Sequence, residues 1–230
     1  MRIWDIDAGF LNSPSLLGEH RELHGIYSII TNDKNGYSKH PETLRWKLFP
    51  GGLVRRHGML VAEMKLRGFN HHSPIAESSF REEWPPSFLD APHLQYKILK
   101  EKYRSKSTGR IELPDTIHKL WASHKYSVMA RDYNLYKKIG SMVAINRMTL
   151  PQLSLETTSL LREAPTNKSL RNTLLHMWGH ISKLADKPPE DSLYVLLLDI
   201  QKLSFIHASS YLIQSTALGE LACWIETQDC

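Results

Sequence analysis

The 230-residue chain has few cysteines, no long apolar run and little net charge. Its two cysteines, Cys223 and Cys230, lie close together near the C-terminus. That arrangement excludes a disulfide framework and a zinc ribbon, and it fits a reducing compartment. The first residues, MRIWDID, carry acids where a signal peptide needs an apolar stretch. The most apolar segment, 193–198, is too short to span a bilayer. We therefore expect a cytoplasmic protein with no membrane partner.

The small positive charge is unevenly distributed along the chain. Lysine and arginine number 29 and aspartate and glutamate 24, which gives a net charge of +5. The whole excess lies in residues 1–110, with 17 basic and 12 acidic residues, whereas residues 111–230 hold 12 of each. A polyanion is therefore expected to dock on the first part of the chain.

Hydrophobic periodicity and capping residues predict an all-α protein. An irregular arm at 1–12 precedes a helix over 13–33, and further helices are expected over 53–67 and 93–106. The polar segment 105–110 has the composition of a linker. After it, helices are predicted over 114–145, 151–162, 165–185, 188–207 and 209–226, with short connections that favour an antiparallel bundle. We thus predict a compact few-helix domain at 1–110 and an antiparallel helical bundle domain at 111–230.

The first predicted helix carries a carboxylate, Glu22, with a glycine one turn before it and another one turn after it. Each glycine inside a helix costs roughly 1 kcal/mol relative to alanine. Either a bulky partner must reach the Glu22 carboxylate between Gly18 and Gly25, or a second helix packs closely against the glycines. The sequence leaves both explanations open.

The segment LGEHREL at 17–23 resembles the pyrimidine-dimer DNA glycosylase family, as do the Arg2-Ile3 start and the helix end EMKLRGFN at 63–70. The similarity spans about residues 1–75. In that family the N-terminal amine is the nucleophile, and the second glutamate of the motif is the essential carboxylate. The resemblance therefore implies an amine at Met1 and a carboxylate at Glu22. Met1 is expected to stay in place because Arg2 is too large for ready removal of the initiator methionine.

This pairing is chemically reasonable because a free α-amine has a reference pKa of about 7.7–8.0, so a useful fraction is neutral at neutral pH. The resemblance implies a DNA glycosylase with AP-lyase activity, in which the amine attacks C1′ and an imine forms without any cofactor. Glu22 is expected to stabilise the cationic sugar and to move protons. The expected partner is double-stranded DNA that carries a lesion or modified base. The enzyme is expected to be monomeric and nucleoid-associated.

The resemblance also suggests which residues contact DNA or the substrate. Arg2 and Arg21 are expected to hold phosphates that flank the lesion. The other candidates are His20, His24, Tyr37, Lys39, His40 and Arg45. His40 is either a proton carrier or a turn residue before Pro41. Ser15 and Gly25 depart from the family's phage member, which has histidine and arginine there, so the base that is removed stays open.

Residues 115–226 resemble the YbgA-type helical domain of unknown function. The matching residues are Trp121, His124, Lys125, Tyr126, Met129, Ala130, Pro165-Thr166, Asn172, His176 and Gly179-His180. This similarity implies an all-helical fold and no chemistry. His176 and His180 share a helix face, and with His124 they are either metal ligands, with Asp199 as a further candidate, or packing residues. We expect packing, and no metal site.

An alternative to the enzyme is a non-catalytic nucleic-acid-binding or scaffold protein of DNA repair or phage defence. It predicts salt-dependent DNA binding that does not need Glu22.

Overall fold

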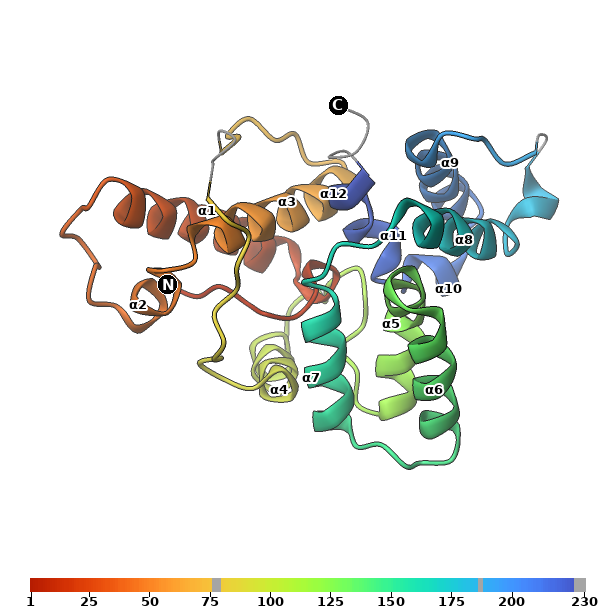
Figure 1. Ribbon diagram of the computed structural model, residues 1–230, viewed down its shortest axis with the longest axis horizontal. Helices are drawn as coiled ribbons and strands as arrows, with labels where there is room; N and C mark the ends of the chain where they lie inside the picture. Colours follow the sequence, from red (N-terminus) through yellow and green to blue (C-terminus); the bar gives the residue numbers. More distant parts are fainter. Residues whose placement is uncertain (76–79, 186–187, 226–230) are drawn as a thin grey trace.

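The computed structural model describes residues 1–75, 80–185 and 188–225, which fold entirely into helices and connecting segments (Figure 1). The predicted all-α class is confirmed. The elements are η1 (Ala8–Phe10), α1 (Ser13–Thr31), α2 (Pro41–Trp46), α3 (Pro50–Leu66), α4 (Pro92–Lys102), α5 (Ile117–Arg131), α6 (Tyr133–Ala144), α7 (Leu150–Leu160), α8 (Asn167–Trp178), η2 (Ser182–Leu184), α9 (Leu193–Ile206), α10 (Ser210–Ile213), α11 (Ala217–Glu220) and α12 (Ala222–Ile225). No helix among the described residues is both long enough and apolar enough to cross a membrane.

Helix α1 forms where the sequence predicts it because its start signal and its apolar stripe agree. The Asn12 side chain accepts a hydrogen bond from the Ser15 amide at 3.0 Å, and a proline follows in the first turn. Leu16 and Leu23, two turns apart, are completely buried. The helix therefore turns one side to the core and leaves the side that carries Glu22 for other contacts.

Three predicted helices are interrupted in the structure. The helix expected over 165–185 ends at Trp178, and the short helix η2 follows it. The helix expected over 114–145 breaks at Asp132, whose side chain accepts hydrogen bonds from the amides of Asn134 and Leu135 at 2.7 and 2.9 Å. This cap ends α5 and starts α6 in a new direction. The segment expected as one helix over 209–226 consists, up to residue 225, of the short helices α10, α11 and α12.

A short helix, α2, lies where the sequence predicts none. It begins at Pro41, directly after His40, whose Nδ1 accepts a hydrogen bond from the Glu42 amide at 3.1 Å. Helix α3 then starts at Pro50, three residues before the predicted start at residue 53. Proline suits the first position of a helix because it has no amide hydrogen to satisfy there.

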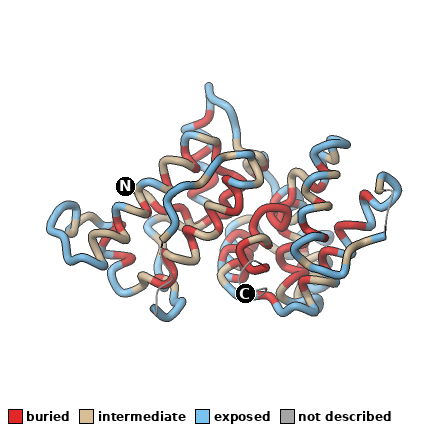
Figure 2. Tube along the Cα trace, turned by 90° about the horizontal axis from the view of Figure 1, so that it is seen from above, coloured by how far each residue is buried: buried red, intermediate tan, exposed pale blue. Residues whose placement is uncertain are grey.

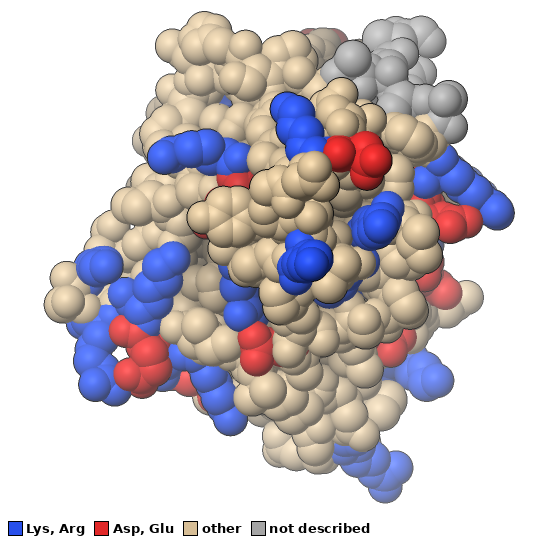
Figure 3. Space-filling model, turned by 90° about the vertical axis from the view of Figure 1, so that its left-hand side faces the viewer, with Lys and Arg blue, Asp and Glu red and all other residues tan. Residues whose placement is uncertain are grey.

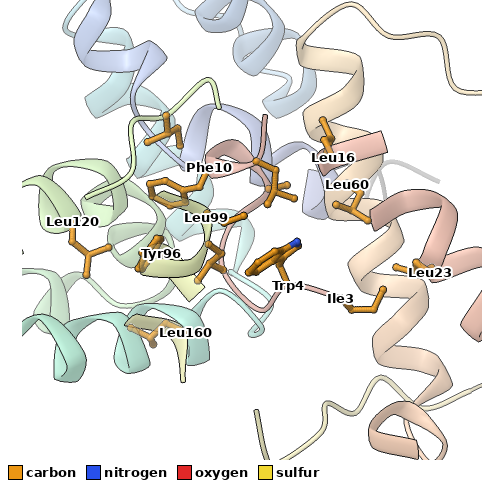
Figure 4. Close-up of a cluster of buried hydrophobic side chains, with 14 of the residues drawn as sticks. Ile3, Trp4, Phe10, Leu16, Leu23, Leu60, Tyr96, Leu99, Leu120 and Leu160 are labelled. Atoms are coloured by element: carbon orange, nitrogen blue, oxygen red, sulfur yellow. The ribbon is translucent and has the colours of Figure 1, made fainter. Parts of the chain in front are cut away.

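The N-terminal arm, residues 1–12, lies in the core. Ile3 and Ile6 are each 1% exposed, and Phe10 is fully buried. Figure 4 shows Ile3, Trp4 and Phe10 among labelled side chains from α1, α3, α4, α5 and α7. Burying one large apolar side chain contributes about 1.5–3 kcal/mol, so the arm is held strongly.

The segment expected as a linker, residues 105–110, ends in a tight contact with this arm. The Ile111 amide donates a hydrogen bond to the Gly9 carbonyl at 2.9 Å, and a Cβ on Gly109 would lie 2.6 Å from the same oxygen. One hydrophobic cluster continues from Ile3 to Leu160, and buried residues run through both ends of the molecule (Figure 2). The division into 1–110 and 111–230 stays a prediction about independent folding.

Candidate active site

Two carboxylates one turn apart on α1 hold the start of the chain against the helix. The Arg2 amide donates a hydrogen bond to Glu22 Oε2, and the Trp4 amide donates to Glu19 Oε1 at 3.2 Å. In an extended segment, alternate residues face the same way, so amides 2 and 4 meet acceptors at positions 22 and 19. The arm is thereby aligned along α1.

This alignment brings the first nitrogen of the chain close to Glu22. Standard bond lengths limit the distance between the Met1 nitrogen and the Arg2 nitrogen to about 4.3 Å. Because the Arg2 amide is hydrogen-bonded to Glu22, the amine lies within about 7 Å of that carboxylate. The Met1 side chain packs against the edge of the core, so its residue is half-buried. The Met1 nitrogen and the Glu22 carboxylate therefore lie in the same neighbourhood.

Glu19 is held in turn by a buried arginine of α3. Arg56 donates from Nε and Nη2 to the two Glu19 oxygens at 2.8 and 3.1 Å, and from Nη1 to the Ile6 carbonyl at 2.9 Å. Both side chains are at most 3% exposed. A bidentate pair of this kind fixes direction as well as distance. It locks the arm, α1 and α3 into one unit.

Arg45 of α2 is a second buried arginine that holds the arm in place. It pairs with Asp5 at 2.9 Å and Glu42 at 2.5 Å, and it donates to the Ile3 carbonyl at 3.2 Å. Its side chain is only 3% exposed. The sequence predicts a DNA contact for Arg45, whereas these contacts make it a positioning residue for the segment that begins at Met1.

The helix surface beside Glu22 is open. A Cβ added to Gly18 or to Gly25 would meet nothing within 4 Å. No second helix among the described residues therefore packs against these glycines, and of the two explanations offered by the sequence, close helix packing is wrong. The surface at Gly18 and Gly25, one turn to either side of Glu22, is available to an external partner.

The remaining predicted DNA contacts lie around this end of the molecule. Arg2 pairs with Asp90 at 2.7 Å and its guanidinium lies 4.3 Å over the Trp4 ring, so it is tied to the protein. Arg21 and Lys39 are exposed. Tyr37 is 72% exposed, and its backbone is left-handed, with φ of 47°. Figure 3 faces this end and shows basic side chains spread over it, with acidic side chains beside some of them.

His40 has a structural contact already. Its Nδ1 caps α2 by accepting the Glu42 amide, which matches the turn role that the sequence leaves open for it. Nε2 is not used in that cap, so a further role in proton transfer stays a prediction.

His20 and His24 lie on the opposite side of α1 from Glu22, because their mean direction differs from that of position 22 by about 180° on a helical wheel. There they join His57 of α3 and His71 of the following segment. One ring nitrogen from each of these four histidines lies within 4.8 Å of the other three, and His20 Nε2 is 3.2 Å from His57 Nε2. The predicted DNA contacts of His20 and His24 thus belong to a different cluster from the amine and Glu22.

Burial makes three of these rings, His20, His24 and His57, harder to protonate than a free imidazole. Burial, followed by the neighbouring His24 and His71, lowers the pKa of His20 to about 4. Burial and the three other rings lower the pKa of His57 to about 3, and burial also lowers the pKa of His24. The Ser73 backbone raises the pKa of His24 and of His57 and so offsets part of this lowering.

Sequence reasoning missed His57 and His71. The spacing of four residues between His20 and His24 was a usable signal, since it places two imidazoles on one helix face. The same spacing places His176 and His180 on one helix face, but among the described residues they form no close group with His124. Among the described residues, the only group of histidine, cysteine or acidic side chains close enough to hold an ion is the one that contains His20.

Of the three second-half histidines for which the sequence predicts packing, only His124 is buried, whereas His176 and His180 are exposed. The His124 ring is buried and stacks on Phe10, and its Nδ1 lies 3.0 Å from the Leu120 carbonyl oxygen. His180 Nε2 lies 2.6 Å from the Tyr126 hydroxyl. His176 is exposed.

Two family models match the chain, in the two parts that the sequence predicts. Residues 1–77 match the model of the pyrimidine dimer DNA glycosylase family. Residues 125–204 match a model described as a protein of unknown function (DUF1722). Each match covers about a third of the chain. No curated protein and no solved structure matches it.

Proposed function

We propose that this protein is a DNA glycosylase with AP-lyase activity that removes a damaged or modified pyrimidine from double-stranded DNA. The observation that carries the proposal is the contact between the Arg2 amide and Glu22, which holds the Met1 amine beside a carboxylate under open space. The match of residues 1–77 to the glycosylase family supports the same reaction class. Neither half of the site is useful alone, because the amine needs a nearby base and the reacting sugar needs a counter-charge.

The reaction follows from these two groups. The neutral Met1 amine attacks C1′, the bond from C1′ to the base breaks, and the base leaves with a proton. The sugar ring then opens as O4′ takes a proton, which leaves an imine between the amine nitrogen and C1′. The imine acidifies the C2′ protons; removal of one of them expels the 3′ phosphate and cuts the strand. Glu22 is the group placed to balance the cationic sugar and to carry these protons.

The decisive experiment is borohydride trapping. Hydride reduces an imine to a secondary amine, so the protein should become covalently attached to a duplex that carries the right base. A panel of duplexes with ultraviolet dimers, abasic sites and bulky modified pyrimidines identifies that base. Peptide mapping should place the attachment on the Met1 nitrogen. Attachment to a lysine, or DNA binding without any trapping on the panel, would contradict the proposed mechanism.

The open glycines predict a variant that is more stable and less active. Gly18→Ala and Gly25→Ala should each raise the free energy of unfolding by about 0.4–1 kcal/mol, because alanine favours the helix and its Cβ meets nothing. If DNA packs against this face, strand cleavage should fall at least several-fold. Thermal unfolding and single-turnover cleavage measure the two effects.

Gly140→Ala is the matched control for these variants. Gly140 lies inside α6, and its Cβ would make only an ordinary contact with Trp121 at 3.5 Å. It should gain similar stability with unchanged cleavage. Unchanged cleavage in Gly18→Ala and Gly25→Ala as well would show that DNA does not approach along this side of α1.

The exposed cations Arg21 and Lys39 are expected to contact phosphates. Arg21→Ala or Lys39→Ala should each weaken duplex binding. Loss of one phosphate contact should also reduce the magnitude of the slope of log affinity against log salt by about 0.9. Titrations at several salt concentrations measure the slope. Lys168→Ala, at an exposed site in the second half, is the control and should leave the slope unchanged. An unchanged slope in both test variants would remove them from the DNA interface.

A further inference from the structure

Four histidines from three separate segments meet at one point. His20 and His24 are one turn apart on α1, His57 comes from α3, and His71 follows the end of α3. Each offers a ring nitrogen, and all four nitrogens lie within 4.8 Å of one another. Four imidazoles rarely gather by packing alone, because each ring carries a polar nitrogen that needs a partner when buried.

Those partners are incomplete among the residues that the structure describes. His20 Nε2 and His57 Nε2 face each other at 3.2 Å, but the buried Nε2 atoms of His24 and His71 have no hydrogen-bond partner in the described part of the chain. In a tetrahedral zinc site with bonds of about 2.0–2.1 Å, neighbouring ligand nitrogens are about 3.3–3.4 Å apart. The one short separation in the cluster therefore already matches the spacing of two ligands of one ion.

The surroundings also suit a metal. The cluster has no carboxylate member among the described residues, so it offers an ion nitrogen ligands alone. A pocket of about 520 Å³, lined in part by His57 and His71, leads to the cluster from the surface.

We infer that His20, His24, His57 and His71 together bind one divalent transition-metal ion, with zinc as the first candidate. An all-nitrogen ligand set excludes magnesium and calcium, which need oxygen ligands, and favours zinc, iron, nickel or copper. Four protein ligands close the coordination shell, which is typical of a structural site.

Such an ion would act on the organisation of α1. It would join α1 to α3 and to the segment after α3, and so set the rotation of α1 that turns Glu22 toward the arm. This inference concerns the opposite side of the helix from Glu22 and does not rest on the proposed reaction.

Metal analysis of the full chain tests the inference. Protein made without a polyhistidine tag and desalted should carry about one transition-metal ion per chain by mass spectrometry of the elements, or take one up from added Zn²⁺. Replacement by Co²⁺ should produce the visible absorption of a tetrahedral nitrogen site. Removing the ion with a chelator should lower the midpoint of thermal unfolding by roughly 5 °C or more, and adding Zn²⁺ should restore it.

Two variants locate the site. His57→Ala and His71→Ala should each lose stoichiometric binding and the cobalt spectrum. His72→Ala should keep both, since His72 is adjacent in sequence but exposed and outside the cluster. The wild-type chelation experiment keeps the test valid if a variant fails to fold. Wild-type protein that takes up no stoichiometric ion from Zn²⁺, Co²⁺, Fe²⁺ or Ni²⁺, or metal that is retained by both variants, would overturn the inference.

Discussion

Replacing Glu22 by glutamine is expected to slow strand cleavage and imine trapping by about 100- to 10,000-fold, while duplex binding changes little. The amide keeps an oxygen that can accept the Arg2 amide, so the arm should stay in place. What is lost is the negative charge and the ability to take a proton. Single-turnover cleavage, trapping yield and binding titrations on the same duplex separate these effects.

Glu101→Gln is the control for this variant, because Glu101 is an exposed carboxylate on α4 and its loss should leave cleavage unchanged. The amine itself is tested by adding residues before Met1. Each added residue moves the amine by up to about 3.6 Å, so a short N-terminal extension should be as damaging as Glu22→Gln. A C-terminal extension of the same length should be harmless. Full cleavage by N-terminally extended or acetylated protein would contradict the assignment of the nucleophile.

The largest loss of stability is expected at Glu63, which lies on α3 away from the reacting groups. Its oxygens accept hydrogen bonds from Arg67 at 2.7 Å and from two nitrogens of Arg110 at 2.9 and 2.7 Å. Arg110 also donates to the Ser215 carbonyl at 3.0 Å. Glu63→Ala leaves these guanidinium groups without their anion inside the protein and should cost about 3–5 kcal/mol. Chemical denaturation measures the change.

Glu101→Ala is the matched control here too, since Glu101 and Arg104 form an exposed pair one turn apart on and after α4. Its loss should cost no more than about 1 kcal/mol. Because the Glu63 network joins α3 to the segments at 110 and 215, the whole protein should unfold in one transition. Two separate transitions would instead support independent domains at 1–110 and 111–230. If Glu63→Ala and Glu101→Ala lowered the free energy of unfolding by similar amounts, the buried network would contribute no more than an exposed ion pair.

The stabilisation by the Glu63 network should depend on pH. Burial alone would raise the pKa of Glu63, but Arg110 and then Arg67 lower it below its ordinary value of 4.5. The folded state therefore holds this proton less tightly than the unfolded chain does. The stabilisation is complete above pH 4.5 and is lost as the pH falls from there through the lower folded pKa. Glu63→Ala should show a weaker loss of stability in that range.

The candidate site could be predicted from the sequence in part. Glu22 stands out locally because it lies between two glycines one turn away on either side, whereas the Met1 amine comes from the resemblance to the glycosylase family. Arg45 was expected at the DNA, whereas the fold buries it against Asp5 and Glu42. No local pattern shows which of several arginines finds buried carboxylates, because the partners come from distant parts of the chain.

The sequence by itself determined the helical class, the start of α1 at its Asn12 cap and the two-part resemblance, because caps, periodicity and motifs act over a few residues. Only the tertiary structure decided that the arm is part of the core, that no described residue covers Gly18 and Gly25, and that His57 and His71 meet the histidines of α1. These are juxtapositions of segments tens of residues apart. They depend on how the helices pack, which cannot be predicted from a short segment of sequence.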